Sequence, residues 1–415
     1  TFIFPFPPAR VPYADVKAAD HWEKRFERFV EPFLDAWRTK KRRLWAPVYL
    51  RGLLVPGERK SIEPIASRVA PGHDQELRHF ISESPWKTEP VEQVLWQKAD
   101  ALLGGEQAVL IIDDTAIPKK GDESVGVAHQ YCGALGKQAN CQSLVSLTLA
   151  RDDVPVPLVL RLYLPESWAR DVERREKVGV PDEIGFRTKW RIALDELQRL
   201  VDAGVRFGTV LADAGYGVCA EFRQTLTQMS VRWAVGIGPE QKFYAAHAGT
   251  RMPRSGPMGP PRKRPLPTHA RRTAKEIVAR LDSNEWRRLS WRVGTKGRLE
   301  ADFCAIRVRT ADGPETTDRV HLPGDEAWLV AERRAPDEIK YYLTNHPANA
   351  KLKTLASAIK ARWSCEQAHQ QLKEELGLDH FEGRSWRGLH HHALMTMICF
   401  EFLQLERLRE NKTAA

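Results

Sequence analysis

The sequence predicts an α/β protein with an N-terminal helical domain and a β-rich insertion, and three observations lead to this prediction. Apolar residues recur at helical spacing through about the first 100 residues. Short apolar, β-branched runs then alternate with an amphipathic stretch, which is typical of a sheet flanked by helices. Alternating polar and apolar segments with turn signals follow between residues 286 and 343, ahead of a helical C-terminal stretch.

Length, charge and cysteine usage narrow the class of protein. At 415 residues the chain is long enough for two or three domains. Its net charge of +10, from 64 Lys and Arg against 54 Asp and Glu, favours polyanionic partners. No apolar run approaches the roughly 20 residues of a membrane span, and the 6 cysteines form no Cys-x-x-Cys pair. We therefore expect a cytoplasmic protein without a membrane association.

The first half of the chain is predicted to pass from helices into a sheet. A helical, positively charged domain is expected over residues 1–104. The apolar run 109–112 predicts a buried strand that ends in two acids, Asp113 and Asp114. Further strands are predicted, each bounded by glycine, proline or polar residues, at 124–131, 142–149 and 158–164.

The second half is predicted to complete the sheet and to interrupt it. An amphipathic helix over 182–203 leads to a second apolar strand, 208–212, that also ends in an acid, Asp213. We assign 105–240 to the first part of an α/β core and 241–345 to a basic linker, dense in Pro, Gly, Arg and Lys over 251–272, with a β-rich insertion. The C-terminal helices, 346–415, are expected to complete the core.

Carboxylates at the ends of strands point to metal chemistry. Neighbouring strand ends can place Asp113 and Asp213 a few ångströms apart. Oxygen ligands favour Mg²⁺ or Mn²⁺, and two such ions about 4 Å apart can drive phosphoryl transfer. A third acid is offered by Glu366, because on a helix Arg362, Glu366 and Lys373 fall in one sector. Each acid alone is also what a turn, a helix cap or a solvated ion-pair face would contain.

Three segments together resemble the catalytic blocks of a bacterial insertion-sequence transposase family in the DDE superfamily. Residues 113–121, followed by 124–133, resemble the first block, and 211–217 resembles the second. The third block has a Tyr-x2-Arg-x3-Glu-x6-Lys signature, which Arg362, Glu366 and Lys373 match, with Ile359 at the tyrosine position. The resemblance runs from about Tyr49 to Leu405.

The resemblance implies a fold and a catalytic set. The fold is an RNase H-like mixed-sheet core with a β insertion between the second Asp and the Glu. Asp113, Asp213 and Glu366 are expected to be both the catalytic residues and the ligands of divalent metal, Mg²⁺ or Mn²⁺, in two ions. Asp114 is the alternative to Asp113, because adjacent residues of a strand face opposite sides.

The resemblance also implies a DNA substrate. DNA contacts are expected from the cations that flank the acids and from one tryptophan: Lys119, Lys120, Arg362, Trp363 and Lys373. Solvated surface is the alternative for the two adjacent lysines. The N-terminal helical domain is expected to recognise the terminal repeats of the element.

The function predicted from these observations is that of a DNA transposase. Such an enzyme binds the terminal inverted repeats of an insertion sequence, cuts at the ends with divalent metal and joins the 3′-OH ends to target DNA. Its partners are double-stranded DNA, as transposon ends and as target, and a second copy of the chain in a synaptic homodimer. The expected location is the bacterial cytoplasm, at the nucleoid when DNA is bound. Two alternatives remain, a domesticated, non-catalytic DNA-binding protein and an RNase H-like structure-selective nuclease.

Overall fold

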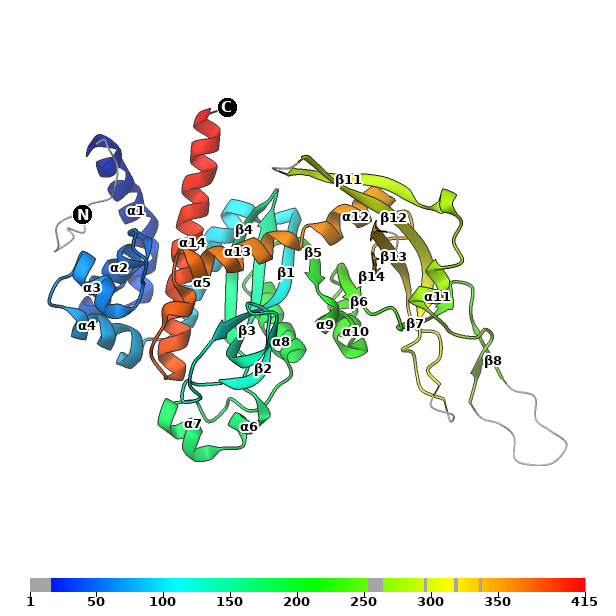
Figure 1. Ribbon diagram of the computed structural model, residues 1–415, viewed down its shortest axis with the longest axis horizontal. Helices are drawn as coiled ribbons and strands as arrows, with labels where there is room; N and C mark the ends of the chain where they lie inside the picture. Colours follow the sequence, from blue (N-terminus) through cyan, green and yellow to red (C-terminus); the bar gives the residue numbers. More distant parts are fainter. Residues whose placement is uncertain (1–15, 253–263, 295–296, 317–319, 336–337, 415) are drawn as a thin grey trace. The chain divides into compact units, whose positions relative to one another are not determined.

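A computed structural model describes residues 16–252, 264–294, 297–316, 320–335 and 338–414. The chain divides into two compact units, and each has its own buried core. The first unit contains residues 1–207 and 363–415, and the second contains 208–362 (Figure 1). The first unit therefore combines the two ends of the chain, and the second is formed by one continuous segment.

Helices form the N-terminal part of the first unit, as the apolar spacing predicts. They are α1 (Val16–Ala36), α2 (Lys40–Leu54), α3 (Ile62–Val69), α4 (Asp74–Arg78), the π-helical turn η1 (His79–Glu83) and α5 (Glu89–Leu103). Aromatic side chains recur on one face of α1, where Trp22 stacks on Phe26 with ring centroids 5.4 Å apart. Both rings meet Phe402 of the C-terminal helix edge-on at 5.5 Å. The two ends of the chain are thus packed together by aromatic contacts.

An antiparallel sheet forms the centre of the first unit. Its strands are β1 (Gly105–Pro118), β2 (Ala128–Cys132), β3 (Lys137–Arg151) and β4 (Val154–Leu162). Strand β3 pairs with the other three, and the register sets Asp113 opposite Ser146 and Ser146 opposite Leu160. The strand predicted to begin at residue 124 begins only at Ala128, because residues 124–127 turn through Gly126 at a φ of +71°.

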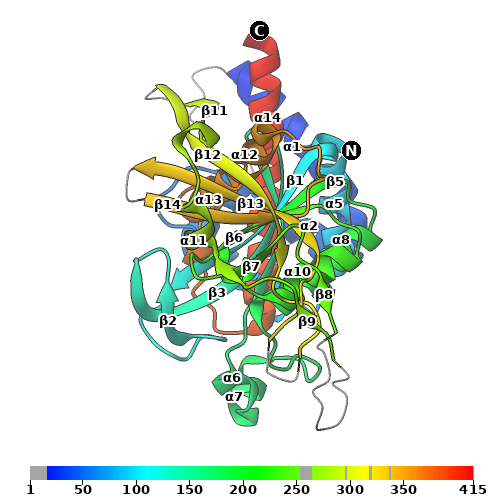
Figure 2. The same ribbon diagram turned by 90° about the vertical axis from the view of Figure 1, so that its right-hand side faces the viewer.

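Helices from both ends of the first unit flank this sheet. They are α6 (Glu166–Ala169), α7 (Val172–Val178), α8 (Lys189–Asp202), α13 (Trp363–Glu374), the 3₁₀ turn η3 (Leu378–His380) and α14 (Trp386–Ala414). Figure 2 shows α13 and α8 on opposite sides of strands β1 and β3. The helix predicted over 182–203 starts at Lys189, after an extended Thr188 cap.

The second unit is built on a mixed sheet. Its strand order is β10-β7-β12-β13-β14-β6-β5, with β11 on the edge of β12. The strands are β5 (Phe207–Ala212), β6 (Trp233–Ile237), β7 (Lys242–Ala245), β10 (Arg272–Thr273), β11 (Arg287–Gly294), β12 (Gly297–Thr310), β13 (Glu326–Ala335) and β14 (Glu338–Thr344). Only the β5–β6 pair is parallel among these described pairings, and the rest are antiparallel. The predicted mixed α/β class with a β-rich insertion is confirmed.

Short helices complete the second unit. They are α9 (Ala214–Gly217), α10 (Ala220–Gln228), α11 (Ala274–Val278), the 3₁₀ turn η2 (Ser283–Glu285) and α12 (Leu352–Lys360). The basic stretch predicted over 251–272 is described in part, since residues 253–263 lie outside the described residues. Its two sides pair as the strands β8 (Thr250–Arg251) and β9 (Leu266–Pro267).

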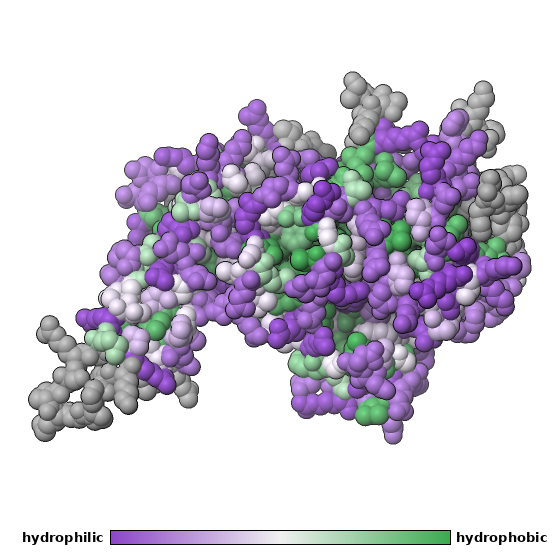
Figure 3. Space-filling view, turned by 180° about the vertical axis from the view of Figure 1, so that it is seen from behind, coloured by the Kyte–Doolittle hydropathy of each residue, from purple (hydrophilic) through white to green (hydrophobic). Residues whose placement is uncertain are grey.

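The surface is largely hydrophilic on the face that Figure 3 draws. Apolar residues appear there as small separate patches rather than as a band. Among the helices of the described ranges, none combines the length and the apolar character that crossing a membrane requires. Even the 29-residue α14 carries charged residues such as Glu401 along its length.

Candidate active site

Asp113 lies in the middle of β1, on the side of the sheet that α13 covers. Its neighbours along the same side of the strand, Ile111 and Thr115, are 0% and 2% exposed. The carboxylate is held by its own chain, because Asp113 Oδ1 accepts a hydrogen bond of 2.9 Å from the amide of Asp114. The register partner Ser146 points to the same side of the sheet. A half-buried carboxylate is thereby fixed against the face of α13.

Helix α13 brings a thiol and an imidazole to this carboxylate. His369 Nε2 lies 2.8 Å from Ser146 Oγ and 3.4 Å from Cys365 Sγ. The Cys365 thiol also donates to Thr148 Oγ1 at 3.4 Å. One ligand atom from each of Asp113, Cys365 and His369 lies within 4.8 Å of the other two. We call Asp113, Cys365 and His369 the α13 cluster.

Cys365 and His369 are functional candidates that the sequence reasoning missed. Both lie inside the segment that matches the third catalytic block, one on each side of Glu366. Their spacing of four residues places them on one face of a helix, where two side chains can share one ligand. That spacing was the available signal.

Asp114 faces the opposite side of the sheet. Its Oδ2 pairs with Lys189 Nζ of α8 at 2.7 Å. In the register Asp114 lies opposite Val145, and Val145 lies opposite Arg161, whose guanidinium is also bound on the α8 side. The two adjacent acids are therefore separated by the pleat of the strand, and only Asp113 is directed at α13.

Glu366 lies on α13 next to Cys365 and is exposed. Since successive helical residues are turned by about 100°, Glu366 flanks the side of the helix that carries Cys365 and His369. Arg362 departs from the expected placement, because α12 ends at Lys360 and α13 begins only at Trp363. The break falls where the chain passes from the second unit to the first, so the predicted helical sector contains Glu366 and Lys373 but not Arg362.

The other residues predicted to contact DNA have different surroundings. Trp363 opens α13 and is 40% exposed, and Lys120 is also exposed. Lys119 donates from Nζ to the carbonyl oxygen of Phe381 at 2.8 Å. Burial lowers the pKa of both Lys119 and Lys373. The negative charge of Asp379 raises the pKa of each lysine but does not outweigh burial. Two lysines that are far apart in the sequence thus share one acidic neighbour.

Asp213 belongs to the second unit, where it follows β5 and caps α9. Its Oδ1 accepts the amide hydrogen of Tyr216 at 3.3 Å. The turn packs closely on β6, since a Cβ at Gly217 would lie 2.0 Å from the carbonyl oxygen of Gly236. A Cβ at Gly236 would in turn lie 2.8 Å from the amide nitrogen of Ala214. These two glycines therefore allow the tight turn that holds the Asp213 carboxylate.

The carboxylates of the first unit suit a hard divalent cation. Mg²⁺ and Mn²⁺ take oxygen ligands, and within the first unit Asp113 and Glu366 carry carboxylates. Asp113 fits because its carboxylate is fixed at the sheet surface while remaining half-buried. Glu366 fits because it is exposed on the helix that covers Asp113. The sulfur and nitrogen donors of Cys365 and His369 suit softer cations instead.

Comparison with known proteins supports the family resemblance. A family described as DDE superfamily endonuclease matches residues 32–298, which is more than half of the 415 residues. The matched range contains Asp113 and Asp213 and ends before α13. A probable transposase for the insertion sequence element IS701, from Microchaete diplosiphon, is 32% identical over 181 residues. That match covers 43% of this chain and 45% of the relative, so it spans less than half the length of each. On the extent of the family match, the chain belongs to the DDE superfamily endonuclease family.

Proposed function

We propose that this protein is a DNA transposase that binds the terminal inverted repeats of an insertion sequence, cuts at the ends and joins the 3′-OH ends to target DNA. The observation that carries the proposal is the opposite orientation of two adjacent acids. Asp113 faces α13, the helix that bears Glu366, while Asp114 is paired with Lys189 on the other side. Membership in the DDE superfamily endonuclease family supports metal-dependent phosphodiester chemistry for these carboxylates.

The proposed catalytic set is Asp113, Asp213 and Glu366, in that order along the chain. Each lies at a position where its backbone is fixed, on β1, at the cap of α9 and on α13 respectively. These carboxylates would hold two Mg²⁺ or Mn²⁺ ions, which when bound would lower the pKa of the attacking water and offset negative charge on the phosphate. The chain itself orients the carboxylates and requires no covalent intermediate with DNA.

The proposed substrate contacts come from four cations and one tryptophan that lie close to Asp113 or Glu366 in the sequence. Lys120 and Trp363 are exposed, and we assign them to the DNA backbone and to an unstacked base respectively. Lys373 and Arg362 are assigned to phosphates near the cut. The anchored Lys119 can reach DNA only if its bond to Phe381 opens, so we expect it to contribute less than Lys120. Since two ends are joined to one target, the proposed active form is a homodimer on DNA.

The proposal is tested by a cleavage and strand-transfer assay on DNA carrying the inverted repeats that flank the coding sequence. In Mg²⁺ the wild type should nick at the repeat ends and join them. Asp113→Asn, Asp213→Asn and Glu366→Gln should each lower cleavage by at least about 100-fold, because each removes a carboxylate that stabilises transition-state charge. Repeat binding, followed by gel shift, should persist in these three variants.

Asp114→Asn is the matched control, since it makes the same chemical change one residue away on the opposite side of β1. It should cleave at close to the wild-type rate. Repeat-specific binding without cleavage in any divalent metal would make the protein a non-catalytic DNA-binding relative. Cleavage of branched DNA without repeat preference or joining would make it a structure-selective nuclease. A loss of cleavage in Asp114→Asn with full activity in Asp113→Asn would reverse the assignment of the two acids.

A further inference from the structure

The α13 cluster combines three donor types that the family chemistry does not need together. Mg²⁺ and Mn²⁺ are bound by oxygen, yet the three ligand atoms that lie within 4.8 Å of one another here are a thiol sulfur, an imidazole nitrogen and a carboxylate oxygen. Thiolate, imidazole and carboxylate are the usual ligands of Zn²⁺ in proteins. The cluster therefore has the chemistry of a second kind of metal site that shares Asp113 with the first.

The spacing of the donor atoms agrees with a tetrahedral cation. Zn²⁺ lies about 2.3 Å from a cysteine sulfur and about 2.0–2.1 Å from a histidine nitrogen, so a tetrahedral angle places these two atoms roughly 3.5 Å apart. Cys365 Sγ and His369 Nε2 are 3.4 Å apart. An oxygen of Asp113 lies within 4.8 Å of both ligand atoms, which a rotation of the carboxylate can shorten. Little backbone movement is needed to bring the three groups onto one ion.

The surroundings keep the two helix ligands in place. Cys365 is 0% exposed and His369 is 6% exposed, so both side chains are held by packing between α13 and the sheet. Ser146 can give up its contact with the ring nitrogen, because its hydroxyl also lies 3.3 Å from Thr148 Oγ1. Three protein ligands leave one position of a tetrahedral cation open for water or a substrate oxygen.

We propose that Asp113, Cys365 and His369 form a site for a thiophilic divalent cation, of which Zn²⁺ is the test case, and that its occupation withdraws Asp113 from Mg²⁺ and stops cleavage. The binding part stands on the geometry of the first unit alone. The inhibitory part rests on the proposed function, because it requires Asp113 to be a ligand of the catalytic metal. Zn²⁺ would thus act as a negative regulator at the catalytic carboxylate.

Binding is tested first, on the full chain and without DNA, by titration with Co²⁺ as a spectroscopic substitute for Zn²⁺. The wild type should develop a near-ultraviolet thiolate-to-cobalt charge-transfer band that saturates at one ion per chain and is bleached by Zn²⁺. Cys365→Ser should lose the band. His369→Gln and Asp113→Asn should keep the thiolate but weaken Co²⁺ binding by at least about 10-fold, as loss of a metal-site partner does.

Cys219→Ser is the matched control, because Cys219 is a half-buried free cysteine in the second unit. Cys219→Ser should retain the charge-transfer band and the Co²⁺ concentration at which the band reaches half of its final intensity. Far-ultraviolet circular dichroism and thermal unfolding without metal show whether each variant is folded. If Cys365→Ser does not fold, the weaker Co²⁺ binding expected of His369→Gln serves as the test. No charge-transfer band in the folded wild type, or a band that survives in Cys365→Ser, would overturn the site and leave the cluster as a hydrogen-bonded part of the core.

Regulation is tested by adding Zn²⁺ to the Mg²⁺-dependent cleavage assay. For each protein, the cleavage rate with Zn²⁺ is compared with the rate of the same protein without Zn²⁺. Zn²⁺ at a concentration that bleaches the cobalt band should inhibit the wild type and Cys219→Ser by more than about 10-fold, whereas Cys365→Ser should lose most of this sensitivity. Equal inhibition in Cys365→Ser would refute the regulatory part. If the wild type does not cleave in Mg²⁺ at all, the proposed function fails, while the cobalt titration still decides whether the metal site exists.

Discussion

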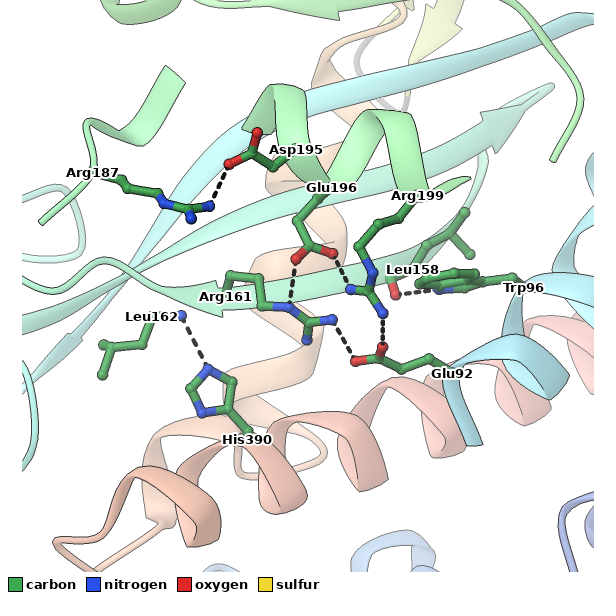
Figure 4. A network of polar contacts seen from close by, with 10 residues as sticks. All are labelled: Glu92, Trp96, Leu158, Arg161, Leu162, Arg187, Asp195, Glu196, Arg199 and His390. Carbon is green, nitrogen blue, oxygen red and sulfur yellow. Dashed lines mark hydrogen bonds and ion pairs between the residues drawn. The ribbon is translucent and has the colours of Figure 1, made fainter. Parts of the chain in front are cut away.

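The two sides of the β1–β3–β4 sheet carry polar residues of different kinds. On the side of α8, charges meet opposite charges: Arg161 lies 2.6 Å from Glu92 and 2.8 Å from Glu196 (Figure 4). Arg199 bridges the same two carboxylates at 2.8 and 2.6 Å. On the side of α13, a carboxylate, a thiol, an imidazole and two hydroxyls converge. The first arrangement balances charge within the protein, and the second collects donor atoms around one point.

This difference indicates which side supports the fold and which side supports chemistry. Glu92 loses water on burial, which raises its pKa, but Arg161 and Arg199 outweigh this and hold the pKa below its ordinary value. Burial likewise lowers the pKa of Arg161, and Glu92 and Glu196 outweigh it and raise the pKa. The network joins α5, β4 and α8, so it ties the N-terminal helices to the sheet. Its function is to hold the scaffold on which Asp113 is mounted.

The largest expected effect comes from breaking the network on the α8 side. Arg161→Met leaves Glu92, which is 1% exposed, with one guanidinium in place of two. Removing one partner of a buried ion pair costs about 3–5 kcal/mol of unfolding free energy, because the remaining charge stays out of water. Urea or guanidinium unfolding at neutral pH measures the loss.

Arg187→Met is the matched control for that measurement. Arg187 pairs with Asp195 at 2.7 Å, but the two side chains are 55% and 44% exposed (Figure 4). Solvent screens such a pair, so its loss should change the unfolding free energy by at most about 1 kcal/mol. Similar losses of unfolding free energy in Arg161→Met and Arg187→Met would show that the buried network does not stabilise the sheet. The two sides of the sheet would then differ in residue composition but not in their contribution to stability.

A smaller effect is expected from pH, through a histidine that borders the network. His390 Nε2 accepts the amide hydrogen of Leu162 at 3.4 Å, and its Nδ1 lies 2.9 Å from the carbonyl oxygen of Trp386. Burial, with the nearby positive charge of Arg161, lowers the pKa of His390 from 6.5 to about 4. The neutral ring satisfies both contacts, whereas a protonated ring would have no acceptor for the Leu162 amide.

The sign of the pH dependence follows from this lowered pKa. The unfolded chain binds a proton near pH 6.5 and the folded chain only near pH 4, so stability is complete above pH 6.5 and falls as the pH drops toward 4. The loss reaches about 3 kcal/mol at 1.36 kcal/mol per unit of pKa. Unfolding free energies of the wild type and His390→Gln should therefore diverge at neutral pH and converge near pH 4. Parallel curves would contradict the assignment.

The sequence predicted the parts of the molecule that depend on local pattern. The strand that leads to Asp213, the N-terminal helices and the β insertion follow from apolar periodicity and turn residues. The strand predicted to end at Asp113 and Asp114 instead runs on to Pro118, because the acids and the residues after them keep pairing with β3. Alternation along a strand also shows that the adjacent acids must face opposite sides. Alternation alone cannot show which side of β1 meets α13. That choice depends on packing between segments about 250 residues apart in the sequence, which no local pattern encodes.

Other features depended on tertiary contacts and could not be predicted from local pattern. The break between α12 and α13 interrupts a continuous helical pattern where the chain changes units. Lys119 has the sequence context of a DNA-binding lysine, yet its amine donates to Phe381, far along the chain. The α13 cluster combines Cys365 and His369 with a strand residue that only the folded chain brings to them.

The smallest expected effect comes from Lys189→Met, and it discriminates most finely between the two sides of β1. Lys189 and Asp114 are each about one third exposed, at 31% and 32%, and lie 2.7 Å apart, so losing the pair should cost no more than about 1 kcal/mol. The Mg²⁺ concentration for half-maximal cleavage should stay unchanged, because Asp113 faces away from Lys189. If Asp114 were the ligand instead, removing a competing ammonium would lower that concentration. A Mg²⁺ titration of both proteins measures this, and a shift to lower Mg²⁺ would transfer the catalytic role to the α8 side of the sheet.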